Sequence, residues 1–157
     1  MNIEVQFSVQ DLLARYIQAI DDDRLEVWPD FFVDECRYVI TTADNLEQRL
    51  PLGLIYATSR AMLRDRVRSL RQANVYEAQR YRHVIGPPRV EPLGTGLVRA
   101  ETNFIVARIM HSGETMIFAT GRYDDRIALD GAEGPRFVEK TVVLDSRLID
   151  TLLAIPL

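Results

Sequence analysis

The sequence predicts an α+β fold in which amphipathic helices come first and a curved sheet of long antiparallel strands follows. Apolar residues recur at helical spacing within the first 73 residues, whereas from Arg80 onward the pattern has a period of two. Short glycine-containing segments of hairpin type separate the period-two stretches, and they are too short to hold the crossover that parallel strands require. We therefore expect one domain spanning residues 1–157.

Three helices are predicted ahead of the sheet. Ser8 and Asp11 resemble a capping box at the start of the first helix. The acidic run that ends at Asp23 is unfavourable at a helix C-terminus, so we expect Asp23 to open a short second helix. Its buried residues include Trp28. Thr58 is the expected N-cap of a third helix. The first helix carries an apolar stripe made of Val9, Leu12, Leu13, Tyr16, Ile17 and Ile20.

The third helix, predicted over Ser59–Ala73, carries a stripe of arginines on one face. Two interpretations of this stripe stay open: a solvated surface, or a surface that meets carboxylates of a partner. Its members are Arg60, Arg64, Arg68 and Arg71.

Strands are expected wherever β-branched and aromatic residues alternate with polar ones. Gly121, inside one of them, indicates a bulge or bend in a curved sheet. The predicted strand Leu97–Met110 has apolar residues on the face that should meet water, namely Ile105, Ala107 and Ile109. This suggests that another subunit covers that face. The predicted strands are Cys36–Thr42, Arg80–Pro92, Leu97–Met110, Thr115–Leu129 and Arg136–Leu144.

The last ten residues carry many apolar side chains, although chain termini normally fray. We expect this tail to dock, either across its own sheet or on a partner. The apolar residues of the tail are Leu148, Ile149, Leu152, Leu153, Ile155 and Leu157.

Composition excludes several classes of function. A net charge of −4 argues against nucleic acid as the main partner. The sequence has no apolar run near the roughly 20 residues of a membrane helix, and its start, MNIEVQF, lacks the features of an export signal. A cytoplasmic location is expected. The sequence contains one cysteine, Cys36, and two histidines. These are too few ligands for a Cys/His zinc or iron–sulfur cage within this chain.

The stretch RYRHVIGPP, residues 80–88, places His83 between two arginines and a branched apolar pair. Helices on a curved sheet form a cone, and a histidine with a carboxylate in such a cone can act as a general base. The catalytic alternative is therefore His83 with Asp30 and Tyr38. A histidine on a strand is also often a hydrogen-bonded structural residue, so the stretch can equally be a subunit contact.

Four segments of the chain resemble the small (beta) subunit of Rieske-type aromatic-ring-hydroxylating dioxygenases. The similarity extends in order over nearly the whole sequence. The segments are WPDFF at 28–32, YRHVIG at 81–86, RIMHSGET at 108–115 and DTLLAIPL at 150–157.

This resemblance implies a cystatin-like, nuclear transport factor 2-like cone used as a scaffold. It also implies a large (alpha) subunit that carries a Rieske [2Fe-2S] cluster and a mononuclear iron, an α3β3 hexamer, and a reductase acting on the assembled complex. The implied reaction is dihydroxylation of an aromatic carboxylic acid, with terephthalate the expected one, by O2 and electrons from NAD(P)H. No cofactor or metal is expected in this chain.

On this interpretation the chain has no catalytic residue, and an alternative remains a free-standing dehydratase or isomerase with His83 as base. The residues expected at the subunit interface combine the aromatic and basic segment around His83 with the tail. They are Trp28, Arg80, Tyr81, Arg82, His83, Leu152, Leu153, Ile155 and Leu157.

Overall fold

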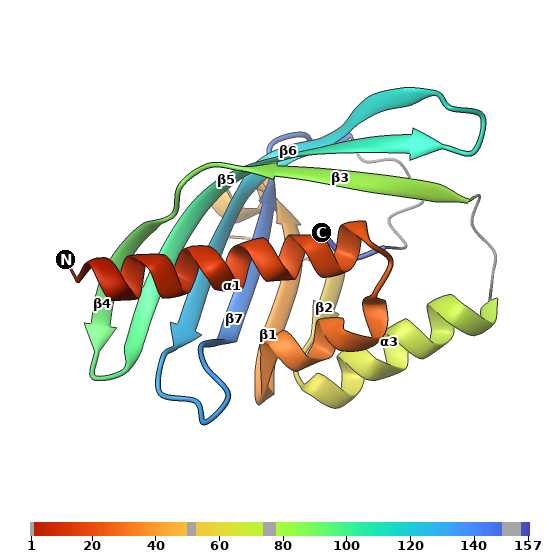
Figure 1. Ribbon diagram of the computed structural model, residues 1–157. Helices are drawn as coiled ribbons and strands as arrows, with labels where there is room; N and C mark the ends of the chain where they lie inside the picture. The colour runs from red at the N-terminus through yellow and green to blue at the C-terminus, as the bar shows by residue number, and fades with distance from the viewer. Residues whose placement is uncertain (1, 50–52, 74–77, 149–154) are drawn as a thin grey trace.

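The computed structural model describes residues 2–49, 53–73, 78–148 and 155–157, and it confirms the α+β fold with helices packed on a curved sheet (Figure 1). The helices are α1 (Ile3–Asp21), the 3-10 helix η1 (Leu25–Phe31), α2 (Ala43–Glu47) and α3 (Arg60–Ala73). The strands are β1 (Phe32–Thr42), β2 (Ile55–Ala57), β3 (Gln79–Ile85), β4 (Arg89–Gly94), β5 (Leu97–Met110), β6 (Thr115–Ala128) and β7 (Arg136–Leu144).

All the strands join one sheet in the order β2-β1-β7-β6-β5-β3, with β4 also paired to β5. The prediction of a purely antiparallel sheet is wrong at one pair, because β1 and β7 run parallel. A short connection in the sequence predicts that the two strands it joins form a hairpin. It gives no information on β1 and β7, which are separated by most of the chain. The β1–β7 pairing therefore leaves no local signal in the sequence.

The predicted strand Arg80–Pro92 is two strands, β3 and β4, which pair with successive parts of β5. Gly86, Pro87 and Pro88 interrupt the ladder because proline has no amide hydrogen to donate. Gly86 still donates its N–H to the Asn103 carbonyl oxygen at 2.9 Å, so the chain turns a corner without leaving β5.

Several boundaries differ from the predictions. Helix α1 begins six residues earlier than expected, because the Asn2 side chain accepts the Glu4 N–H at 2.9 Å and caps it. Ser59, rather than Thr58, caps α3 by accepting the Met62 N–H at 3.2 Å. Strand β1 begins at Phe32, and the short elements α2 and β2 were not predicted.

Gly121 allows the close approach of β6 and β7. A Cβ atom at this position would collide with the carbonyl oxygen of Val143. The register of β5 and β6 also shifts between Val106 and Ala107, which is a bulge near the same bend. The predicted irregularity at Gly121 is therefore confirmed as a tight contact beside a bulge.

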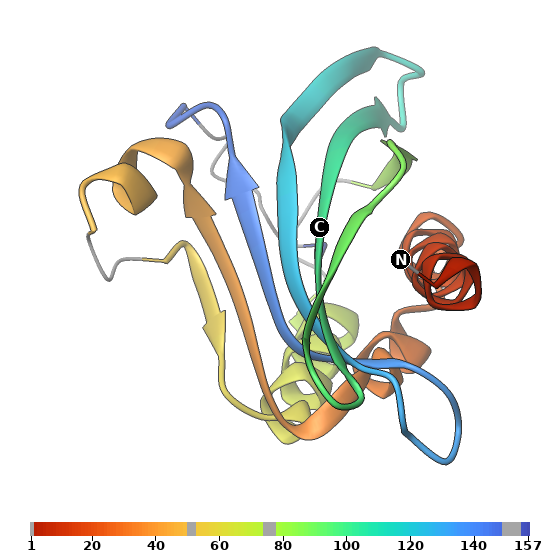
Figure 2. The same cartoon turned by 90° about the vertical axis from the view of Figure 1, so that its left-hand side faces the viewer.

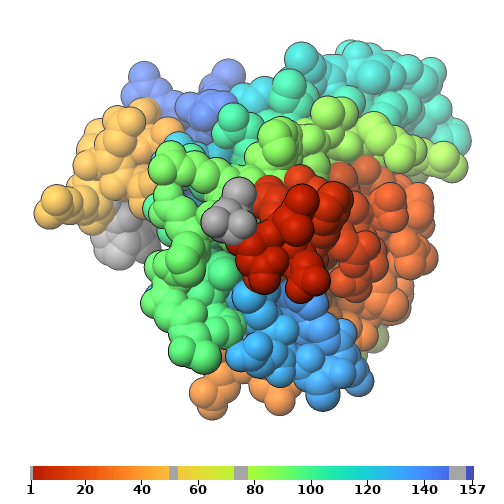
Figure 3. Space-filling view, turned by 60° about the vertical axis from the view of Figure 1, so that its left-hand side comes forward, coloured from red at the N-terminus to blue at the C-terminus, as the bar shows by residue number. Residues whose placement is uncertain are grey.

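Helices α1 and α3 cover one face of the sheet, the inner face, while α2 lies toward the other face (Figures 1 and 2). The first part of α1 is seated beside β4 and the connection between β6 and β7 (Figure 3), and Gln6 Nε2 donates to the Pro88 carbonyl oxygen at 2.8 Å. Fully buried aromatic side chains fill the space under the helices: Tyr16, Trp28, Phe32, Tyr38, Tyr123 and Phe137.

Candidate functional site

His83 lies on the inner face of β3, and its side chain is completely buried. Its Nδ1 atom lies 2.6 Å from Oδ1 of Asp21, and its main-chain N–H donates to Oδ2 of the same carboxylate at 2.9 Å. A carboxylate on Nδ1 favours the tautomer with the proton on Nδ1. Nε2, which has no hydrogen-bond partner among the described residues, then faces the core. His83, the base of the catalytic alternative, thus faces the cone and joins β3 to the end of α1.

The partner of His83 is Asp21, a residue that is not among the predicted site residues. Asp21 is the last residue of α1, and its side chain is 3% exposed. A signal was present, because an acidic residue at a helix C-terminus opposes the helix dipole and therefore needs another reason to be there. Asp21 and His83 are 62 positions apart in the sequence, so no local pattern indicates their pairing.

The structure does not bring together His83, Asp30 and Tyr38, the residues of the catalytic alternative. The Asp30 side chain is 58% exposed and lies 3.6 Å from Arg64 on α3. The Tyr38 hydroxyl is buried and donates to the main-chain oxygen of Leu157 at 3.0 Å. His83 lines neither the groove at the end of α1 nor the groove on the outer face of the sheet.

A buried ion pair occupies the middle of the inner face. Lys140 Nζ donates to Asp125 Oδ2 at 3.0 Å, and both side chains are fully buried. The ammonium group lies 3.7 Å from the ring centre of Tyr123 and 4.6 Å from that of Tyr16, which is cation–π geometry. Burial raises the pKa of Asp125 to about 6, although Lys140 opposes the rise. Burial also lowers the pKa of Lys140.

The described part of the tail docks inside its own chain. Ile155 and Leu157 are buried, and the Leu157 main-chain oxygen accepts the hydroxyls of Tyr16 at 2.8 Å and Tyr38 at 3.0 Å. The predicted interface residues Leu152 and Leu153 lie outside the described residues. The described side chains and the described end of the tail therefore fill the cone, and within this part of the chain the His83 side chain is not open to solvent.

Each arginine of the α3 stripe lies beside a carboxylate of the same chain. Arg60 pairs with Asp34 at 3.0 Å, and Arg71 pairs with both Asp23 and Glu26. The pairs on Arg64 and Arg68 are longer, at 3.6 and 3.3 Å. These partners lie on β1, η1, α3 itself and the turn before η1, so the stripe meets carboxylates of its own chain, and contact with a partner stays a prediction.

The predicted interface residues divide between the two faces of the sheet. Trp28, Tyr81 and His83 are buried inside the cone. Arg80 and Arg82 are exposed and alternate with them on the outer face of β3.

Beside Arg82, an apolar patch crosses three strands of the outer face. The outer patch consists of Val84 on β3, Ile105 on β5 and Ile117 on β6, which are 64%, 46% and 66% exposed. Val84 and Ile105 are direct cross-strand partners. Of the apolar outward residues predicted in β5, Ile105 is therefore exposed, whereas Ala107 and Ile109 are partly buried.

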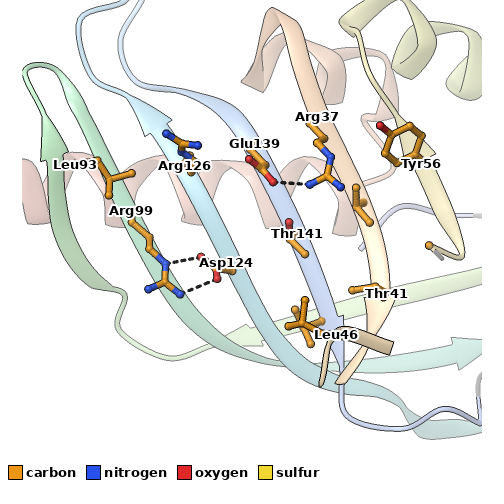
Figure 4. Close-up of a pocket in the computed structure, with 13 residues that line it drawn as sticks. Arg37, Thr41, Leu46, Tyr56, Leu93, Arg99, Asp124, Arg126, Glu139 and Thr141 are labelled. Carbon is orange, nitrogen blue, oxygen red and sulfur yellow. Dashed lines mark hydrogen bonds and ion pairs between the residues drawn. The ribbon is translucent and has the colours of Figure 1, made fainter. Parts of the chain in front are cut away.

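A groove of about 590 Å³ follows the same outer face toward β7 and β1 (Figure 4). Its rim includes the apolar side chains of Leu46, Tyr56 and Leu93. Charged side chains from β1, β5, β6 and β7 also line it, and they are Arg37, Arg99, Asp124, Arg126 and Glu139.

The described residues contain no group of three His, Cys, Asp or Glu side chains placed to hold a metal ion. Within the same part of the chain, no helix is long and apolar enough to cross a membrane.

The sequence of this chain matches a model of a known protein family. The family model described as "Ring hydroxylating beta subunit" matches residues 15–151. The chain belongs to this family of dioxygenase beta subunits. The resemblance found in the sequence is thereby confirmed, and the chain is one part of an oxidoreductase complex in which beta subunits pair with an alpha oxygenase subunit.

Two curated relatives cover almost the whole chain. The terephthalate 1,2-dioxygenase terminal oxygenase component subunit beta 2 of Comamonas sp. is 44% identical over 145 residues, which is 92% of this chain and 93% of the relative. The anthranilate 1,2-dioxygenase small subunit of Burkholderia cepacia is 36% identical over 156 residues, covering 99% and 96%. These two family members are named for different aromatic acids.

Solved structures support the fold. The beta subunit of an aromatic-ring-hydroxylating dioxygenase from Novosphingobium aromaticivorans superposes with a TM-score of 0.89 at 37% identity, covering 98% of this chain and 97% of that one. A scytalone dehydratase-like protein from the same organism has a TM-score of 0.71 at 12% identity, covering 92% and 87%, and shares the fold alone. The cone fold expected from the resemblance is confirmed.

Proposed function

We propose that this chain is the non-catalytic scaffold subunit of a Rieske oxygenase that dihydroxylates an aromatic carboxylic acid, with terephthalate the first candidate. The large subunit would hold the [2Fe-2S] cluster and the mononuclear iron, and a reductase would supply electrons from NAD(P)H. The proposed assembly is an α3β3 hexamer in the cytoplasm, where NAD(P)H is available.

The uncovered outer patch is the observation that carries the scaffold role. Three large branched side chains on adjacent strands lose contact with water only when another surface covers them, and such cover favours association. The cone, in contrast, is closed by its own aromatic side chains and by Leu157. The geometry therefore supports binding through the outer face better than catalysis in the cone.

The residues available also agree with this division of labour. A Rieske centre needs two cysteines and two histidines, whereas this chain has one cysteine and two histidines in total. Cys36 is buried, and His83 is held by Asp21. Substrate choice is proposed from the relative named for terephthalate, which is 44% identical to this chain.

Co-expression with the cognate large subunit tests the proposal. We expect the two chains to co-purify at equal stoichiometry, with all the iron in the large subunit, and the complex with its reductase to oxidise terephthalate. Light scattering coupled to size-exclusion chromatography gives the stoichiometry. Stoichiometric iron in the isolated small chain, or failure of the two chains to associate, would contradict the scaffold role.

A further inference from the structure

Four charged residues form one row across the outer face of the sheet. Arg99 on β5 is the direct cross-strand partner of Arg126 on β6, Arg126 is the partner of Glu139 on β7, and Glu139 is the partner of Arg37 on β1. Like charges that face each other directly on a sheet are destabilising. The juxtaposition of Arg99 and Arg126 therefore needs an explanation.

The carboxylates near Arg126 are engaged by other arginines. Asp124 accepts two hydrogen bonds from Arg99, at 2.8 and 2.7 Å. Glu139 accepts one from Arg37 at 2.6 Å. Figure 4 shows these ion pairs on either side of Arg126. Among the described residues, the exposed Arg126 guanidinium makes no hydrogen bond or ion pair.

The groove around Arg126 suits an anionic group carried by a protein. The lining contains three arginines and two carboxylates, so the groove has a net positive charge, although the whole chain carries −4. Leu46, Tyr56 and Leu93 give its rim exposed apolar surface. Apolar contacts around a charged centre are typical of protein–protein interfaces, where arginine is enriched.

We propose that Arg126 binds an aspartate or glutamate side chain of the large oxygenase subunit, and that this groove is part of the contact between the two subunits. The proposal rests on the scaffold function above and adds the partner chemistry to it. The groove and the outer patch share β5 and β6, so one partner surface can cover both. A partner carboxylate compensates the charge that Asp124 and Glu139 leave unpaired.

The test compares charge substitutions in the affinity of the small subunit for the cognate large subunit, measured by biolayer interferometry. Arg126→Gln should weaken binding by about 30-fold and Arg126→Glu by more, because a partner carboxylate would be left without its cation. Arg68→Glu on α3 is the matched control, since Arg68 is exposed and, among the described residues, pairs with Asp65 on the same helix. The control should change affinity by less than about twofold.

Stability and chemical labelling complete the experiment. The thermal midpoint of isolated Arg126→Gln should equal or slightly exceed that of the wild type, because a like-charge contact with Arg99 is removed. Phenylglyoxal should modify Arg126 in the free chain but not in the complex, and should modify Arg68 in both.

The outcomes separate the two proposals. Failure of the wild-type chain to bind the large subunit would overturn the scaffold function itself. Binding of the wild type together with unchanged affinity in Arg126→Glu, or an equal loss in Arg68→Glu, would overturn only the role of Arg126.

Discussion

His83 and Asp21 form a buried pair that fixes one end of α1 to the sheet. Both oxygens of Asp21 are used, one by the imidazole and one by the main-chain N–H of His83. Loss of the imidazole leaves a buried carboxylate with one partner fewer. Such a loss lowers the free energy of unfolding, since a buried charge that loses its partner retains its desolvation cost. The histidine is therefore a structural tie between two elements.

Replacing His83 should reduce stability strongly. We expect His83→Ala to lower the free energy of unfolding by about 3 kcal/mol. His111→Ala is the control, because His111 is exposed in the turn between β5 and β6, and it should change stability by less than about 0.5 kcal/mol. Urea unfolding followed by circular dichroism measures both. Equal stability of the two variants would contradict the structural role of His83.

The Lys140–Asp125 pair should give the protein a recognisable pH dependence. Because burial raises the folded-state pKa of Asp125 from 3.8 to about 6, the folded chain binds more protons than the unfolded chain in that interval. The contribution of Asp125 to the unfolding free energy therefore falls as pH rises from 3.8 to about 6, and it is constant above that interval.

The double variant Asp125→Asn with Lys140→Met removes this titration. Across the same pH interval, the unfolding free energy of the wild type should fall relative to that of the double variant. Urea titrations at several pH values measure the difference, and parallel pH profiles for the two proteins would show that Asp125 titrates normally.

At the scale of elements, the close contact of β6 with β7 depends on one residue without a side chain. Gly121→Ala should lower the unfolding free energy by about 2 kcal/mol, because the new methyl group forces the Val143 carbonyl away. Gly94→Ala is the matched control, since nothing lies within 4 Å of the added Cβ in β4. Thermal unfolding of both variants decides the point, and an equal midpoint would disprove the contact.

The sequence predicted those elements whose signal is local. The apolar stripe from Val9 to Ile20 indicated α1, and the alternation in β5 indicated both its buried face and the apolar residues on its outer face. The parallel pairing of β1 with β7 and the contact of Asp21 with His83 were missed, because each joins residues far apart in the sequence. The five residues of α2 were too few for a recognisable period.

The candidate site was predictable only in part. Arg80 and Arg82 were selected from composition around His83, and they do lie on the outer face. Trp28, Tyr81 and Leu157 were selected for the same interface but are buried in the core, because aromatic and apolar residues serve cores and interfaces alike. The importance of Arg126 depends on which carboxylates are already paired, which only the three-dimensional arrangement reveals.

At the scale of the whole molecule, the two faces of the sheet have different tasks. The inner face carries the buried pairs and the aromatic core that stabilise the cone. The outer face carries the apolar patch and the arginine-lined groove, both open to a partner. If assembly uses the outer face, as proposed, this chain can act as a beta subunit without an open cavity in its cone.

Substitution at the centre of the outer patch tests this account most directly. Ile105→Asp should weaken binding of the large subunit by about 30-fold or more, because a charge would be buried at the contact. Val27→Asp is the control, since Val27 is an apolar residue of similar exposure, 38% against 46%, on η1 beside the helices.

The measurement is light scattering of each small-subunit variant mixed with the large subunit. We predict an intact complex for the wild type and Val27→Asp, and separated subunits for Ile105→Asp while that variant alone remains folded. An Ile105→Asp chain that assembles as well as the wild type would contradict the assignment of the outer face to subunit contact.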